Sequence, residues 1–72
     1  MERFGEKLRM LRKRHGLTLR ELAAKLGHSS HSYVTNLERG ERKPSAEMAV
    51  KIADLFGVAI DQLLRDELEV ES

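Results

Sequence analysis

Glycine and proline residues divide this chain into short segments and thereby limit what it can fold into. The dividing residues are Gly16, Gly27, Gly40, Pro44 and Gly57. Between them lie segments of about 8 to 15 residues in which apolar side chains recur at helical spacing. No segment alternates apolar and polar residues over a useful length, as a half-buried strand would. We therefore expect an all-α domain of five short helices.

Local signals predict where these helices begin and end. Thr18, followed three residues later by Glu21, has the pattern of a capping box and indicates a second helix over about residues 18–26. A third helix is expected over about residues 30–38, and Ser45 is the expected N-cap of the fourth. The side chains expected to face the core from the first four helices are Phe4, Leu8, Leu11, Leu22, Ala23, Leu26, Val34, Leu37, Ala49, Ile52, Ala53 and Phe56.

The two halves of the chain carry opposite charge. The formal net charge is only +1, but residues 1–43 sum to +6 and residues 44–72 to −5. A basic front half is suited to meet a polyanion, and an acidic back half can face solvent or a partner.

Several classes of protein are excluded or disfavoured. The chain has no cysteine, which excludes disulfides and thiolate metal sites. His28 and His31 lie close in sequence, but two ligands rarely hold a structural metal, and a polar turn explains both. No apolar run approaches the roughly 20 residues of a membrane span, and no signal peptide is visible, so a cytoplasmic protein is the default. There is no serine-histidine-aspartate pattern or glycine-rich phosphate loop, so we expect neither an enzyme nor a cofactor.

Two short helices joined by a glycine-containing turn form the pattern of a helix-turn-helix. The turn begins at Gly27, and the helix after it needs only Val34 and Leu37 inward. Its outward positions are short or polar and almost uncharged, which suits the reading of base edges; they are His31, Ser32, Thr35 and Asn36.

These segments resemble the phage Cro and repressor-type helix-turn-helix domain, the xenobiotic-response-element family of bacterial transcription regulators. The matching segments are residues 8–12, 16–23, 26–27, 32–40, 44–45, 57–58 and 63–64. Together they cover roughly residues 4 to 65, so the resemblance implies a lambda-repressor-like domain over residues 1–65. Residues 66–72 are expected to be an acidic tail or a dimerisation element.

The resemblance implies roles for individual residues. The positions that match base-reading residues are His31, Ser32, Thr35 and Asn36. The positions expected at DNA phosphates are Thr18, Arg20, Ser30, Tyr33, Arg42 and Lys43. Arg12 and Glu38 match a pair that ties the first helix to the end of the third. Met48, Leu55, Leu64 and Leu68 are the candidates for a dimer interface.

The chain departs from the family pattern at two places. Relatives often have one residue fewer in the turn after Gly27, so either Ser29 or Ser30 caps the third helix. Many relatives have glutamine where Leu19 stands, and leucine cannot bond phosphate.

Two functions follow as hypotheses. The first is a sequence-specific regulator that binds double-stranded DNA as a homodimer on a near-palindromic operator, of the small-repressor or restriction–modification controller type, with no small-molecule ligand. The alternative is a protein-interaction module or antitoxin that keeps the fold without reading DNA. The dependence of DNA binding on salt distinguishes the two.

Overall fold

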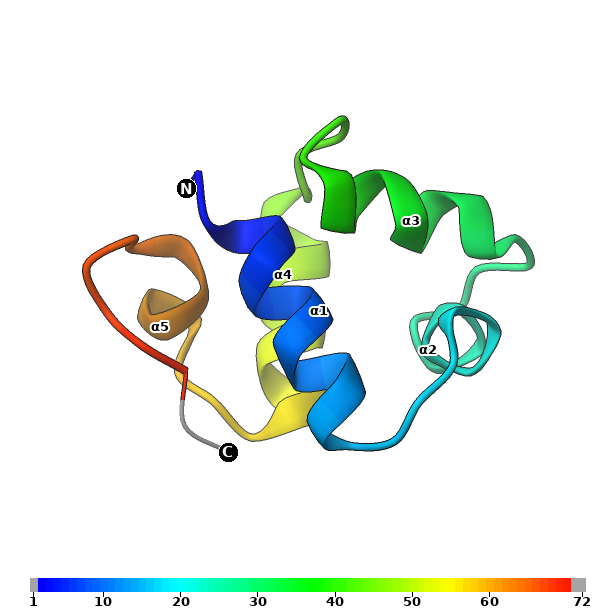
Figure 1. The fold of residues 1–72 in the computed structure, drawn as a ribbon, viewed down its shortest axis with the longest axis horizontal. Helices are drawn as coiled ribbons and strands as arrows, with labels where there is room; N and C mark the ends of the chain where they lie inside the picture. Colours follow the sequence, from blue (N-terminus) through cyan, green and yellow to red (C-terminus); the bar gives the residue numbers. More distant parts are fainter. Residues whose placement is uncertain (1, 71–72) are drawn as a thin grey trace.

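The computed structural model describes residues 2–70 and confirms the all-α expectation for this part of the chain. It contains five helices and no strand within these residues. The helices are α1 (Phe4–Arg14), α2 (Leu19–Lys25), α3 (His31–Arg39), α4 (Ala46–Phe56) and α5 (Ile60–Leu64). Figure 1 shows α2 and α5 at opposite ends of the long axis, with α1 in front of α4 and α3 along one edge. No helix among these residues is long and apolar enough to cross a membrane.

Side-chain caps fix the beginnings of three helices. The backbone N–H of Glu21 donates to Thr18 Oγ1 (3.0 Å), and the N–H of Thr18 donates to Glu21 Oε1 (2.8 Å), which confirms the predicted capping box. The pKa of the Glu21 carboxyl lies below its usual range, chiefly because the backbone N–H of Thr18 donates to it. The predicted cap of α4 is confirmed by Ser45 Oγ, which accepts from the N–H of Met48 at 3.1 Å.

The cap of α3 settles which serine begins that helix. Ser30 Oγ accepts from the N–H of Ser32 at 3.2 Å, so the N-cap is Ser30 and not Ser29. At the other end, Gly40 has a φ of +77°, in the left-handed region where a side chain is strained. The predicted stop at Gly40 is therefore confirmed, with α3 one residue longer at this end than expected.

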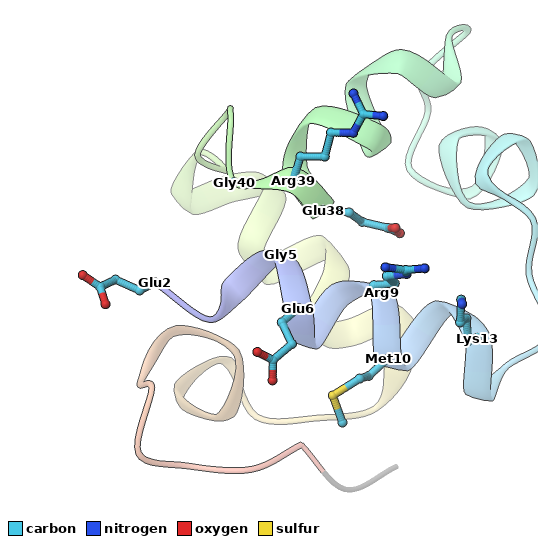
Figure 2. Close-up of a pocket in the computed structure, with 9 residues that line it drawn as sticks. All are labelled: Glu2, Gly5, Glu6, Arg9, Met10, Lys13, Glu38, Arg39 and Gly40. Atoms are coloured by element: carbon cyan, nitrogen blue, oxygen red, sulfur yellow. The ribbon is translucent and has the colours of Figure 1, made fainter.

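A glycine inside α1 allows α1 and α3 to cross at very short range. Gly5 is buried, and a Cβ atom there would lie 2.6 Å from the carbonyl oxygen of Leu37 and nearer still to that of Glu38. Figure 2 shows Gly5 directly beside the end of α3. Sequence analysis did not single out Gly5, because glycine within a helix gives no local signal of what crosses it.

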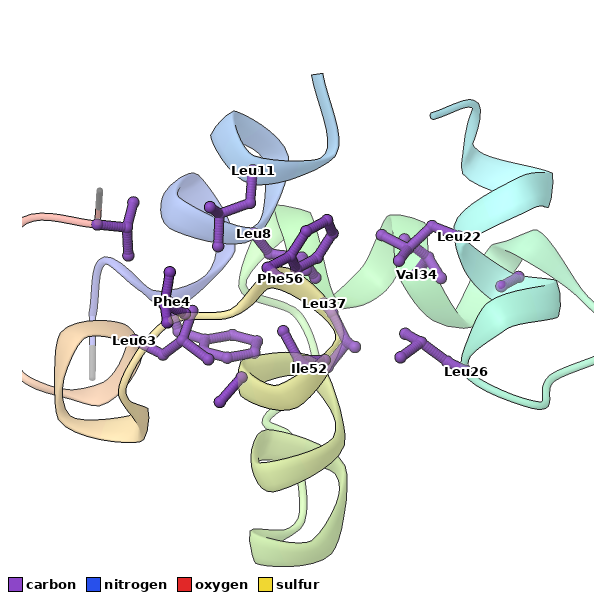
Figure 3. Close-up of a cluster of buried hydrophobic side chains, with 14 residues drawn as sticks. Phe4, Leu8, Leu11, Leu22, Leu26, Val34, Leu37, Ile52, Phe56 and Leu63 are labelled. Carbon is purple, nitrogen blue, oxygen red and sulfur yellow. The ribbon is translucent and has the colours of Figure 1, made fainter. Parts of the chain in front are cut away.

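The core forms where the five helices meet, and the hydrophobic residues that the first four helices contribute to it were predicted. Every side chain expected to face inward from the first four helices is at most 4% exposed. Figure 3 shows the central group meeting from all five helices: Phe4, Leu8, Leu11, Leu22, Leu26, Val34, Leu37, Ile52, Phe56 and Leu63. Burying a leucine or phenylalanine side chain contributes roughly 1.5–3 kcal/mol each, so this cluster supplies most of the driving force for folding.

Residues 65–70, which we term the C-terminal clasp, return along α1. Asp66 accepts hydrogen bonds from the backbone N–H groups of Arg3 (2.9 Å, Oδ1) and Glu2 (3.1 Å, Oδ2). It thus caps α1, whose own N-cap residue, Arg3, makes no side-chain cap. The backbone N–H of Arg3 is also the main reason why the pKa of Asp66 lies below its usual range.

Two further contacts join the clasp to α1. Lys7 is fully buried, and its Nζ donates to the carbonyl oxygens of Gln62 and Arg65, both at 2.7 Å, at the end of α5. Arg14 donates to the carbonyl oxygen of Val70 at 2.9 Å, and Val70 is 2% exposed and part of the core. Residues 66–70 of the expected tail therefore pack on the domain; the rest of that segment, residues 71–72, lies outside the described residues.

Candidate nucleic-acid interface

The outward side of α3 carries the four predicted base-reading residues on neighbouring turns. Ser32 is exposed, and His31, Thr35 and Asn36 are partly exposed. Thr35 Oγ1 donates to the carbonyl oxygen of His31 at 3.2 Å, so its hydroxyl proton is used within the helix. Ser32, Thr35 and Asn36 are polar side chains without an ionisable group.

An ion pair fixes α3 relative to the scaffold. Arg12 Nε donates to Glu38 Oε2 at 2.7 Å, and Arg12 Nη2 donates to Glu38 Oε1 at 3.2 Å. The two side chains are only 13% and 8% exposed, and Arg12 Nη1 also donates to the carbonyl oxygen of Leu17. This bidentate geometry holds α1, the link to α2 and the last turn of α3 in one arrangement.

Tyr33 holds both segments that flank α3. The ring of His28, in the turn before α3, stacks on the Tyr33 ring with centroids 4.0 Å apart and planes 10° from parallel. The Arg42 guanidinium, in the loop after α3, lies 5.2 Å from the centroid of the same ring. The backbone N–H of Arg42 donates to the carbonyl oxygen of Asn36 at 3.2 Å. The longer turn and the basic loop are therefore both fixed against α3.

The residues predicted to contact phosphate lie around α3. Arg20 is exposed and lines a hollow of about 450 Å³ together with Ser30 and His31. Lys43 is exposed and lines a separate hollow of about 340 Å³ with Arg42. Thr18 lies at the start of α2, where its hydroxyl oxygen accepts the capping bond. The structure thus brings Arg20 close to the beginning of α3 and places Lys43 beside Arg42.

The candidates for a dimer interface are only partly exposed. Met48, Leu55 and Leu64 pack against the core cluster at its edge, and Leu68 in the clasp is also partly buried. Sequence analysis missed Val50. Its side chain is 47% exposed, whereas the other large hydrophobic side chains of residues 2–70 are buried or partly buried. Its position off the inward face of α4 was visible in the helical spacing.

Sequence analysis also missed the part that His28 takes in this region. His28 was interpreted as a residue of a polar turn, whereas its ring packs on α3 through Tyr33. No local pattern signals a contact between two aromatic rings across a turn, although the pair is separated by only five positions in sequence.

Comparison with known proteins matches this arrangement to one family. A family profile described as helix-turn-helix matches residues 8–63. An uncharacterised HTH-type transcriptional regulator of Methanocaldococcus jannaschii is 42% identical over 57 residues, which is 79% of this chain and 85% of the relative. An HTH-type transcriptional regulatory protein of Thermococcus kodakarensis is 39% identical over 70 residues, 93% of this chain but 22% of the relative. The chain therefore spans about a fifth of the length of that longer relative.

Two solved structures have the same fold. The N-terminal DNA-binding domain of SinR from Bacillus subtilis superposes with a TM-score of 0.81 at 30% identity, covering 96% of this chain and 100% of that domain. The restriction–modification controller protein C.AhdI from Aeromonas hydrophila gives a TM-score of 0.76 at 35% identity, covering 88% of this chain and 94% of the controller. The chain belongs to the Cro/repressor-type helix-turn-helix family, a family of transcription regulators and not of enzymes.

Proposed function

We propose that this chain is a sequence-specific DNA-binding regulator that acts as a homodimer on a near-palindromic operator. The observation that carries the proposal is the outward side of α3. It presents short polar side chains on a helix whose position is fixed by the pair of Arg12 and Glu38. A helix that only kept a protein soluble would more often carry lysine and glutamate there.

Asn36 is the residue from which we expect most of the base discrimination. Its amide can bond an adenine edge in bidentate fashion, and such a pair contributes about 1–3 kcal/mol of discrimination. His31 and Ser32 are expected to reach bases nearer the start of α3. The hydroxyl proton of Thr35 is already donated to His31, so the methyl group of Thr35 is the part we assign to a contact with thymine.

The phosphate contacts are assigned to residues around α3, and they position the protein without specifying sequence. Arg20 and Ser30 are placed to meet the backbone at the start of α3, and Arg42 and Lys43 after its end. Because Arg42 already lies on the Tyr33 ring, it loses less conformational freedom on binding than a freely moving arginine would.

The dimer is assigned to the outer parts of α4 and α5 together with Leu68. Two copies must place their α3 helices about 34 Å apart to enter successive major grooves on one side of the duplex. We expect Val50→Glu to weaken the dimer in sedimentation experiments, because it would bury a charge at the interface. Ala24→Glu adds the same charge at an exposed position of α2, away from α4 and α5, and should leave the dimer intact.

Selection of binding sites from random duplex DNA tests the proposal. A recovered palindrome with fixed half-site spacing supports a dimeric specific regulator. Asn36→Ala should then lower affinity by about 5- to 150-fold for each half-site, and by the square of that factor for the dimer on its operator, following the 1–3 kcal/mol above, and relax the preference at one position of each half-site. Glu67→Ala, an exposed change in the C-terminal clasp, is the control. If Asn36→Ala left affinity and base preference unchanged, the assignment of α3 as the reading helix would be wrong.

Leu19 supports a second candidate function, a protein-interaction module or antitoxin that does not read DNA. Leu19 packs against the edge of the core and has no group that bonds phosphate, at a position where many relatives have glutamine. If this second function holds, the folded protein enriches no DNA site, and whatever DNA it binds is held without sequence preference.

A further inference from the structure

Three basic side chains near the end of α3 are not used by the fold. Arg9 and Lys13 lie one turn apart on α1, Arg39 is the last residue of α3, and all three are exposed. We refer to these three residues as the basic ledge. Figure 2 shows Arg9 and Lys13 extending from α1 on the side where α3 lies. Within residues 2–70 none of the three takes part in an ion pair or donates a side-chain hydrogen bond.

Most other basic residues on α1, on α4 and in the clasp do have hydrogen-bond partners within the protein. Their side chains donate to carboxylates or backbone carbonyls of the protein itself; they are Arg3, Lys7, Arg12, Arg14, Lys51 and Arg65. The basic ledge is thus a local surplus of positive charge with no acceptor in the described fold.

The surroundings of the ledge leave that surplus largely uncompensated. The ledge lines part of a hollow of about 450 Å³ between α1 and the end of α3. Two acidic residues that line the same hollow already have partners: Glu38 is paired with Arg12, and Glu6 with Arg3. Glu2 lies at the opposite end of the hollow from Lys13 (Figure 2).

The ledge adjoins the proposed reading face. A second hollow, of about 270 Å³, is lined by Arg9 and Arg39 together with Thr35. Arg39 also follows Asn36 by three residues and Thr35 by four, so it lies on the same side of α3 as these two. A duplex that meets Thr35 and Asn36 therefore brings its backbone close to Arg39 and Arg9.

We propose that the basic ledge binds the phosphate backbone of the operator on the α1 side of α3, beyond the base pairs that α3 reads. The inference rests on the proposed DNA-binding function. Arginine suits this task because its planar guanidinium forms paired hydrogen bonds with phosphate oxygens, and Lys13 adds a point charge. α1 would thereby be a DNA-binding element in addition to its part in the scaffold.

The salt dependence of binding tests this inference. Each phosphate contact that releases a counterion contributes about 0.9 to the slope of log K against log salt. Because a dimer on the operator carries each substitution twice, we expect Arg9→Gln to reduce the slope by about 2, and Arg9→Gln combined with Lys13→Gln to reduce it by about 4. Affinities for the selected operator and for an unrelated duplex of equal length should fall by the same factor, with base preference unchanged.

Two controls separate phosphate binding by the ledge from a general effect of net charge. Arg65→Gln removes the same charge from a residue that pairs with exposed Glu67, and it should leave the slope close to that of the wild type. Arg9→Lys combined with Lys13→Arg keeps both charges and should keep the slope. Circular dichroism and the thermal midpoint should match the wild type in every variant, because the altered side chains are exposed.

The possible failures are distinguishable. If the wild type selects an operator but the Arg9 and Lys13 variants keep its full slope, the ledge does not bind DNA while the proposed function stands. The same conclusion follows if Arg65→Gln changes the slope as much as Arg9→Gln. If the folded wild type selects no site, the proposed function fails and the ledge proposal fails with it.

Discussion

Two regions of the molecule are held in shape by hydrogen bonds of different reach along the chain. One is the recognition unit, residues 18–43, and the other is the C-terminal clasp, residues 65–70. Within the recognition unit, the bonds that set its shape join residues that are near in sequence. Thr18 pairs with Glu21, Ser30 with Ser32, and Asn36 with Arg42. The clasp is held by bonds from Arg3, Lys7 and Arg14 that cross 56 to 66 positions of the chain.

This difference predicts how each region responds to damage. Local bonds close short loops at little entropic cost, so they define the shape of the recognition unit. Its position relative to α1 depends on separate links between α1 and α3. The clasp exists only when the whole fold has formed. Substitutions at the links to the recognition unit should therefore alter both stability and DNA binding. Substitutions in the clasp should alter stability alone.

The largest effect is expected at the link between α1 and the recognition unit. Glu38→Gln keeps the shape but leaves the buried Arg12 guanidinium without its counter-charge, which costs about 3–5 kcal/mol for a buried pair. Urea denaturation measures the loss, and operator affinity measured on the folded fraction should fall too. Glu47→Gln, an exposed change on α4, is the control. A loss below about 1 kcal/mol would mean that the pair behaves as an exposed one.

A second link is the crossing of α1 and α3 at Gly5. Alanine normally stabilises a helix by about 1 kcal/mol relative to glycine. At Gly5, however, the added methyl group meets the carbonyl oxygens of Leu37 and Glu38, and such overpacking costs about 1–3 kcal/mol. Gly5→Ala should therefore lower the thermal midpoint. In Gly40→Ala the new side chain meets open space, so the change measures backbone strain alone, about 1–2 kcal/mol. A stabilised Gly5→Ala protein would contradict the close crossing.

The same contrast explains what could be predicted from the sequence. The recognition unit is signalled locally: Thr18 with Glu21 gives one helix start, and Gly40 gives a helix end. Ser29 and Ser30 could not be separated, because both are capping residues and only the three-dimensional turn decides between them.

The clasp carries no such signal. Asp66 and Val70 lie in an acidic stretch whose composition is typical of a solvated tail, and residues 66–72 were accordingly expected to be a tail or a dimerisation element. Lys7 sits on the inward face of α1, where a charge is unexpected, and only the open carbonyl groups at the end of α5 explain it. Partners far apart in the chain are not visible in a single sequence. The partners of the clasp lie more than 50 positions away, and Leu37 and Glu38 lie more than 30 positions from Gly5.

Within the clasp, Val70→Ala is the next test. The change removes about two buried methyl-sized groups at about 0.8 kcal/mol each, so we expect a loss of about 1–2 kcal/mol. Operator affinity measured on the folded fraction should stay at the wild-type value. Val50→Ala is the matched control, because the same atoms are removed from an exposed position; unfolding should be compared at protein concentrations below dimerisation. A change in base preference in Val70→Ala would contradict the prediction that substitutions in the clasp alter stability without altering DNA binding.

The smallest effect concerns acid sensitivity, and it tests whether Asp66 caps α1. The N–H of Arg3 lowers the pKa of Asp66, so its ionised form is favoured by folding. The stabilisation is then present above the unfolded pKa, about 3.9, and is lost as the pH falls through the lower folded value. Asp66→Asn should be less stable than the wild type at pH 7, and the difference should shrink below about pH 4.

Some acid sensitivity should remain in Asp66→Asn, because hydrogen bonds from Arg3 also lower the pKa of Glu69. Combining Asp66→Asn with Glu69→Gln should remove more of it, since both carboxylates act on the same end of α1. Asp54→Asn removes a charge from an exposed position on α4 and controls for the change in net charge. If Asp66→Asn and the wild type lost stability in parallel from pH 7 to pH 2, the Asp66 carboxylate would not stabilise α1, and the clasp would depend on its other contacts, among them the pair of Arg3 and Glu69.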